Sequence, residues 1–210
     1  MSEPVAERSR GALLLLVALF AAAGLWFVVG SDEAYSPVVR GARAPGFELA
    51  RLSIATGSAG GNTGAGTLEL ASLSGRVVLV NFWATWCEPC EQEMPAMQRL
   101  YERLPRDRFE LVAVSIDDEE AKVAEFAARY SLTFPIVMDP GKKVAETYQT
   151  MGVPESLLID ASGRIVERYV GPREWDASEY VERIEALFGA GMSGADGSLE
   201  APAEGPPRVD

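Results

Sequence analysis

Four nearly continuous apolar runs follow one another in the C-terminal part of the chain, at 77–83, 109–116, 156–160 and 165–170. Runs of this kind are typical of strands that are covered on both faces of a sheet. The last two runs are separated by Ala-Ser-Gly at 161–163, which predicts a hairpin turn. The hairpin adds antiparallel strands, so we expect a mixed sheet.

Between and after these runs, apolar residues recur at helical spacing and predict three helices whose stripes face the core. The stripes comprise Met94, Met97, Leu100, Tyr101 and Leu104; Val123, Phe126 and Tyr130; and Tyr180, Val181, Ile184 and Leu187. Asp176 followed by Glu179 matches a capping box for the last helix. Helices that alternate with buried strands predict an α/β fold, with a right-handed strand-helix-strand unit at its start.

Two shorter apolar segments, 47–52 and 67–70, predict a further pair of strands ahead of the first run. The glycine-rich segment 56–66 between them predicts a flexible surface loop. Residues 189–210 are rich in glycine, proline, alanine and serine, and we expect a disordered tail there.

Residues 11–30 carry no charged side chain, and a helix of that length spans about 30 Å, the thickness of a bilayer core. Two arginines precede the segment and two acids follow it, which places the N-terminus in the cytoplasm. A signal peptide cleaved near alanines 21–23 is the alternative, but the apolar segment is long for one. Either interpretation places the folded part outside the cytoplasm, where disulfides persist.

The expected organisation is therefore a cytoplasmic N-terminus at 1–10, a transmembrane anchor at 11–30, a linker at 31–45, a folded domain at 46–188 and the tail at 189–210. The expected location is the inner membrane, with the folded domain on the periplasmic side.

The composition of the chain argues against some partners and against some kinds of site. The formal net charge of -12 makes nucleic acid an unfavourable partner. The chain contains no histidine and only two cysteines, so one chain cannot supply the four ligands of a tetrahedral structural zinc site. We expect neither a metal nor a cofactor.

The two cysteines, Cys87 and Cys90, lie where the first apolar run gives way to a predicted helix. Free amides at a helix N-terminus stabilise an anion, so Cys87 is expected to be the attacking thiolate, although Glu88 opposes this effect. Cys90 lies one turn further on, within reach of a disulfide, and would resolve a mixed disulfide formed at Cys87. An inert disulfide is the alternative, but so small a loop constrains few unfolded states.

The segment 80–90, VNFWATWCEPC, resembles the active-site signature of the thioredoxin family. Glu93 and Pro95 extend the resemblance to the membrane-tethered TlpA/ResA/CcmG (DsbE) branch, as does GVPES at 152–156. The resemblance covers roughly residues 40–188. It implies a thioredoxin fold, a central mixed sheet flanked by helices, with an N-terminal β-hairpin extension and a transmembrane helix ahead of it.

The resemblance also implies roles for single residues. Glu93 is expected to lie under the site and to move a proton for Cys90, whereas Asn81 replaces the buried aspartate of thioredoxins proper. Without the resemblance, Glu93 is more simply an exposed acid in a first helical turn.

A second group of residues is expected to receive the partner protein. Pro154 resembles the family's cis-proline, which would present the Val153 backbone to a partner chain. Glu155 either lines this groove or is an exposed loop acid, and Trp86 is expected to offer an apolar contact surface.

The leading functional hypothesis is a reductase of extracytoplasmic protein disulfides, with apocytochrome c as the expected substrate and a membrane thiol-reductant donor of the CcdA/DsbD type. A reductase for copper-site assembly in cytochrome oxidase, or a copper-binding dithiol, is an alternative. A thiol peroxidase of the redoxin group is another, although Ala84 stands where that group has threonine.

Overall fold

The computed structural model describes residues 38–52, 66–117 and 119–189, and every structural statement below concerns these ranges. None of their helices is both long enough and apolar enough to cross a membrane. The expected anchor at 11–30, the tail beyond Gly189 and most of the glycine-rich segment 56–66 lie outside the described residues.

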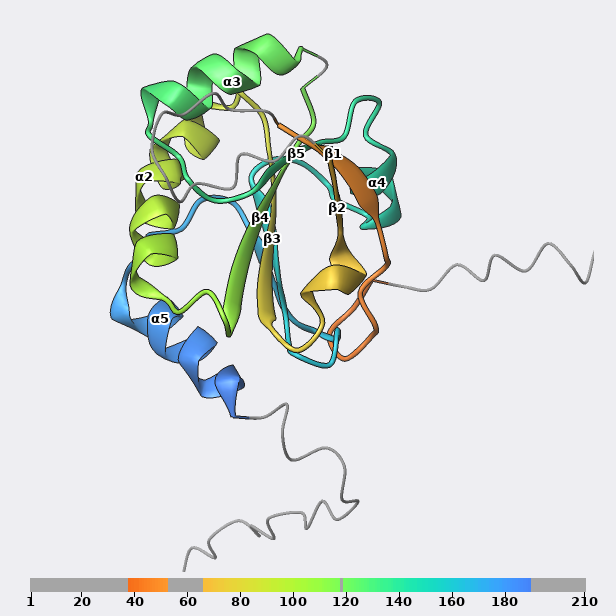
Figure 1. Cartoon of the computed structure of the whole chain (residues 1–210), viewed down its shortest axis with the longest axis vertical. Coiled ribbons are helices and arrows are strands. Elements are labelled where there is room, and N and C mark those ends of the chain that lie inside the picture. Colours follow the sequence, from red (N-terminus) through yellow and green to blue (C-terminus); the bar gives the residue numbers. More distant parts are fainter. Residues whose placement is uncertain (1–37, 53–65, 118, 190–210) are drawn as a thin grey trace, which may run out of the picture. The chain divides into compact units, whose positions relative to one another are not determined.

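Seven strands form one sheet in the order β2-β1-β5-β4-β3-β6-β7 (Figure 1). They are β1 (Glu48–Arg51), β2 (Thr67–Glu69), β3 (Val77–Trp83), β4 (Phe109–Ser115), β5 (Ile136–Met138), β6 (Glu155–Ile159) and β7 (Ile165–Val170). Strand β3 pairs in parallel with β4 and antiparallel with β6, which confirms the mixed sheet. Strands β1 and β2 form an antiparallel pair, which confirms the N-terminal hairpin.

Helices cover both faces of the sheet. They are α2 (Glu88–Arg103), α3 (Glu120–Arg129), α4 (Lys143–Thr147) and α5 (Ser178–Glu185), with the short 3-10 helices η1 (Leu70–Leu73) and η2 (Ala186–Phe188). On one face of β3, Asn81 bonds to α2 and Trp83 packs on Phe126 of α3. On the other face, Phe82 packs on Tyr148, which follows α4. Figure 1 shows α2 and α4 on opposite sides of the sheet accordingly.

The core is centred on β3 and β4, whose residues are all buried. Burying one large aliphatic or aromatic side chain stabilises a fold by roughly 1.5–3 kcal/mol, so these two runs account for much of the stability. The strand bounds agree with the apolar runs to within a residue. The cysteine pair follows shortly after the C-terminal end of β3.

Two expectations about local structure were wrong. The last helix has no capping box, because α5 begins after Ala177 without a side-chain cap and Asp176 instead pairs with Arg99 of α2. The domain also begins before residue 46, since the backbone of 41–44 bonds to Gly163 and Ile165 at the β6–β7 turn.

Candidate active site

The cysteine pair lies where β3 passes into α2. Cys87 is the N-cap residue of α2, and its sulfur accepts a hydrogen bond from the Cys90 amide at 3.2 Å. The two residues form a disulfide, with their Cα atoms 5.2 Å apart. Pro89 occupies the first turn, where a missing N–H removes no helical bond. A thiolate at Cys87 would therefore be stabilised both by the helix dipole and by one backbone hydrogen bond.

The two sulfurs differ in accessibility. Cys87 is 5% exposed and Cys90 is fully buried beneath it. A partner sulfur can therefore reach Cys87 only, and Cys90 is positioned to attack Cys87 from inside the protein. The difference in burial supports the order of attack that the sequence analysis expects.

The loop ahead of β6 lies beside the pair. The Val153–Pro154 peptide bond is cis, as the resemblance implied. Glu155 pairs in register with Phe82, so Pro154 lies next to the end of β3 that leads to Cys87. Trp86 and Val153 both line a cavity of about 360 Å³. The structure thus brings two of the expected partner-binding residues, Trp86 and Val153, to one cavity beside the end of β3 that leads to Cys87.

Exposed apolar side chains gather at the same end of the sheet. Trp86 is 66% exposed and Met151, in the loop before Pro154, is 83% exposed. Val170, opposite Glu155 in the sheet, is also exposed. Large apolar side chains that stay in water beside a reactive group are typical of a protein-binding surface.

Glu155 does not line the groove. Its side chain is fully buried and forms an ion pair with Arg168 of β7. Its second oxygen accepts a hydrogen bond from the Met151 amide at 3.1 Å. The acid is held inward because a buried carboxylate needs a cation and donors, and Arg168 and the loop supply them. Glu155 therefore shapes the loop that carries Pro154 rather than contacting a partner.

Glu93 is buried below the disulfide, one turn beyond Cys90, rather than exposed. One carboxylate oxygen accepts from Asn81 Nδ2 at 2.9 Å. The other accepts from the Arg173 amide at 3.2 Å and from Trp175 Nε1 at 3.1 Å. Burial raises the pKa of Glu93 to about 7, because desolvation of the charged form outweighs these three hydrogen bonds. The group can thus take up or release a proton near neutral pH.

Other residues at the site gave no signal in the sequence. Trp175 and Arg173 lie about 80 positions from Glu93. Asp117, at the end of β4, is buried and accepts from both the amide and the hydroxyl of Thr85, at 2.9 and 2.7 Å. It thereby fixes the turn that carries Trp86 and Cys87. The parallel alignment of the ends of β3 and β4 brings Asp117 to Thr85, whereas Arg173 and Trp175 reach Glu93 from the segment between β7 and α5.

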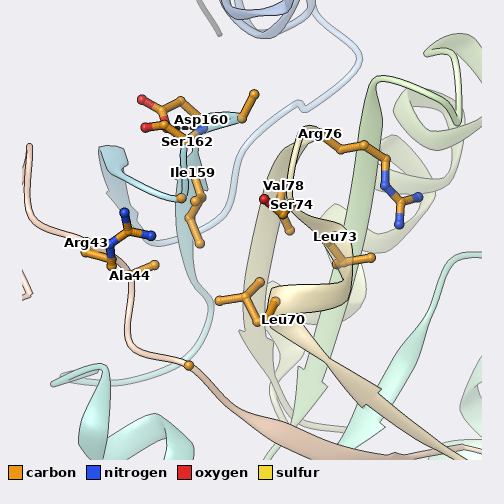
Figure 2. A pocket seen from close by; sticks show the side chains of 14 residues that line it. Arg43, Ala44, Leu70, Leu73, Ser74, Arg76, Val78, Ile159, Asp160 and Ser162 are labelled. Carbon is orange, nitrogen blue, oxygen red and sulfur yellow. Dashed lines mark hydrogen bonds between the residues drawn. The ribbon is translucent and has the colours of Figure 1, made fainter. Parts of the chain in front are cut away.

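A second cavity, of about 310 Å³, lies at the opposite end of β3, around Val78 (Figure 2). Arg76 lines it, but its guanidinium turns away toward Glu110, with which it pairs at 2.9 Å. The carboxylate of Asp160 is occupied by the turn residue Ser162. No cysteine lines this cavity, so the redox chemistry belongs to the cysteine end. Within the described ranges, no group of three or more histidine, cysteine, aspartate or glutamate side chains could hold a metal ion.

The burial of Glu93 predicts how stability depends on pH. Between its ordinary pKa of 4.5 and the folded value of about 7, the folded state holds a proton that the unfolded state has lost. Stability should therefore fall as pH rises through this window, by on the order of 3 kcal/mol. A Glu93→Gln variant should lack this fall, because a glutamine amide keeps a similar shape but does not take up or release a proton between pH 4 and pH 8.

Urea unfolding of the oxidised wild-type and Glu93→Gln proteins between pH 4 and pH 8 measures this effect. The unfolding free energy of the variant should increase relative to that of the wild type as pH rises. A constant difference in unfolding free energy across the range would contradict the prediction.

Comparison with known proteins agrees with this site. Residues 40–168 match the AhpC/TSA family. Thiol-disulfide oxidoreductase ResA of Bacillus cereus is 40% identical over 56% of this chain and 68% of its own length. The protein of the same name from Geobacillus thermodenitrificans is 32% identical over 82% of this chain and 93% of its own.

A solved structure supports the same grouping. The structure of a Chlorobium tepidum protein assigned as thiol:disulfide interchange protein DsbE has a TM-score of 0.62 and 31% identity, over 72% of this chain and 99% of that one. The thioredoxin-like α/β fold expected from the sequence is thereby confirmed.

Proposed function

Because this chain belongs to the AhpC/TSA family, and within it to the ResA-like thiol-disulfide oxidoreductases, we propose that it reduces disulfides of extracytoplasmic proteins during cytochrome c biogenesis. The observation that carries the proposal is the unequal burial of the two sulfurs above a buried acid. Cys87 can be reached from outside, whereas Cys90 and Glu93 are enclosed.

The reaction begins with the dithiol form of the protein. The Cys87 thiolate attacks one sulfur of the partner's disulfide, and the other partner sulfur leaves as a thiolate and takes a proton. Cys90 then loses its proton to Glu93 and attacks the Cys87 sulfur. The Cys87–Cys90 bond forms, the mixed disulfide breaks and the second partner thiol leaves. The partner has gained two electrons and the protein has lost two, so a thiol donor must restore the dithiol.

The cavity that Trp86, Met151 and Val153 line supports the docking of an extended partner chain beside Cys87. The Val153 backbone can pair with such a chain in strand fashion, while the exposed side chains of Trp86 and Met151 provide apolar contacts. In this arrangement the partner's sulfur lies at Cys87. Contacts with backbone and apolar surface suit a substrate that is unfolded when it is reduced, as apocytochrome c is before haem attachment.

The proposed role in cytochrome c biogenesis can be tested separately from the disulfide chemistry. Deletion of the gene should abolish c-type cytochromes, and a Cys87→Ser copy should fail to restore them. The potential of the purified dithiol should be clearly more reducing than that of a strong oxidant such as DsbA, about -120 mV. Normal cytochromes after deletion would rule out this role while leaving the disulfide chemistry intact. In that case a reductase for copper-site assembly becomes the next candidate.

The proposed location is the outer face of the inner membrane, with residues 11–30 as an uncleaved anchor and a CcdA/DsbD-like membrane protein as the electron donor. The uncharged segment and the arginines before it support this placement. N-terminal sequencing of the protein from the membrane fraction tests the anchor, since a start near Gly24 would mean cleavage.

A thiol peroxidase is a second candidate, because the AhpC/TSA match includes Cys87. The geometry argues against it. Ala84 offers no hydroxyl three residues before Cys87, and the neighbouring Thr85 hydroxyl donates to Asp117. Hydrogen peroxide should therefore be consumed no faster by the reduced protein than by a free dithiol. Fast, saturable peroxide turnover would favour the peroxidase.

A further inference from the structure

The segment between β7 and α5 connects the partner-binding loop with the buried acid. Gly171 donates its amide to the Pro154 carbonyl at 2.9 Å. Two and four residues later, the Arg173 amide and the Trp175 indole donate to one oxygen of Glu93. The segment thus contacts both halves of the site, although it contains no cysteine.

Trp175 is held rigidly at this position. It is 1% exposed, and its ring packs on Tyr169 and Tyr180 with centroids 5.1 Å away in both cases. Its indole N–H can only donate, so it favours a carboxylate over a protonated acid at Glu93. A buried tryptophan whose only polar atom bonds to a functional carboxylate has more than a packing role.

We propose that Trp175 is a positioning residue that fixes the Glu93 carboxylate and sets how readily it accepts the proton of Cys90. The inference rests on the proposed function of Glu93. Trp175 touches neither sulfur, and it acts only through the acid.

Two other residues around Glu93 bond to its carboxylate or change its proton affinity. From β3, Asn81 donates to the other oxygen while also donating to Ser156 of β6 at 3.0 Å. The positive charge of Arg173 lowers the Glu93 pKa, and its guanidinium donates to the carbonyl oxygens of residues 170–172. Trp175 is therefore the donor that a substitution can remove without altering charge and without breaking the bond between Asn81 and Ser156.

A Trp175→Phe variant removes the donor and keeps an aromatic ring between the two tyrosines. Losing one hydrogen bond to a charged group should raise the protonation midpoint of Glu93 by about one pH unit. The pH profile for single-turnover reduction of glutathione disulfide by the dithiol protein should move upward by the same amount.

Trp83→Phe is the matched control. Trp83 is equally buried, but its indole nitrogen has no partner among the described residues. This change also reduces the volume of a buried ring, yet it should leave the Glu93 midpoint and the pH profile in place. A general loss of packing would instead move both variants alike.

Carbon-13 NMR of glutamate-labelled oxidised protein measures the midpoint directly, because the resonance that titrates near pH 7 should vanish in Glu93→Gln. If Trp175→Phe does not fold, Tyr180→Ala should shift the midpoint in the same direction by a smaller amount, since Tyr180 is only partly buried. An unmoved midpoint in the folded variant overturns the inference about Trp175. If the midpoint shifts in Trp175→Phe while the exchange profiles of Trp175→Phe and of Glu93→Gln both stay like that of the wild type, the proton role of Glu93 is overturned, and with it the proposal. If the midpoint and the exchange profile shift together in Trp175→Phe and neither shifts in Trp83→Phe, the proposal is supported.

Discussion

A Cys90→Ser variant is expected to accumulate a covalent mixed disulfide between Cys87 and its partner protein. Cys87 remains accessible and keeps its place at the start of α2, so the first attack proceeds. The second attack requires a buried thiol at position 90, and a serine hydroxyl is a far weaker nucleophile than a thiolate. Multiple turnover should be lost, while one equivalent of partner is captured.

Cys87→Ser is the matched control, because it removes the other sulfur from the same motif. Cys90 is fully buried, so this variant should capture no partner. The measurement is non-reducing electrophoresis of membrane extracts, with and without dithiothreitol, followed by mass spectrometry of the captured band. Equal capture by both variants would contradict the assigned order of the two sulfurs. The identity of the captured protein tests the proposed apocytochrome c substrate at the same time.

Glu155→Ala is expected to cause the largest loss of stability among the changes considered, about 3 kcal/mol or more. The substitution removes the partner of Arg168 inside the fold and leaves the Met151 amide without its acceptor. Arg168 also donates to the Tyr148 carbonyl at 2.7 Å and to the Val38 carbonyl at 3.3 Å. The loop that carries Pro154 is thereby released, so disulfide exchange should slow as well.

Glu167→Ala offers a control on the neighbouring strand β7. Glu167 pairs with Arg40 and Arg183, whose side chains are 66% and 42% exposed, and such surface pairs contribute about 1 kcal/mol or less. Urea denaturation of both variants, together with their exchange rates, compares the two acids. Similar small losses would mean that the Glu155–Arg168 pair does not hold the loop.

The sequence predicted those parts of the fold in which local pattern and tertiary environment agree. The bounds of β3 match its apolar run, because burial between layers requires a nearly continuous row of apolar side chains. The bounds of β7 also match, although only Ile165 of that strand is buried, so the expectation that β7 is covered on both faces was wrong. Strand β5 and helix α4 were not predicted. They span three and five residues, which is too short for either periodicity to emerge.

Polar residues were harder to place, because their partners lie far away in the sequence. Asp176 matches a capping pattern, but Arg99 of α2 offers it a charged partner 77 residues away. Glu155 was expected in the groove or in solvent, and Arg168 holds it inside. The sequence alone identified Glu93 as functional only through a family resemblance, since nothing near it indicates burial.

By itself, the sequence determined the α/β class, the positions of the main strands along the chain and the dithiol at the N-terminus of a helix. These features depend on hydrophobic period and on spacings of a few residues, which are local properties. Only the tertiary structure decided that Cys87 is accessible while Cys90 is enclosed, that Glu155 supports the Pro154 loop, and that Trp175 reaches Glu93. Accessibility and the proton affinity of a buried acid are set by groups that folding brings together from distant segments, and no local pattern records them.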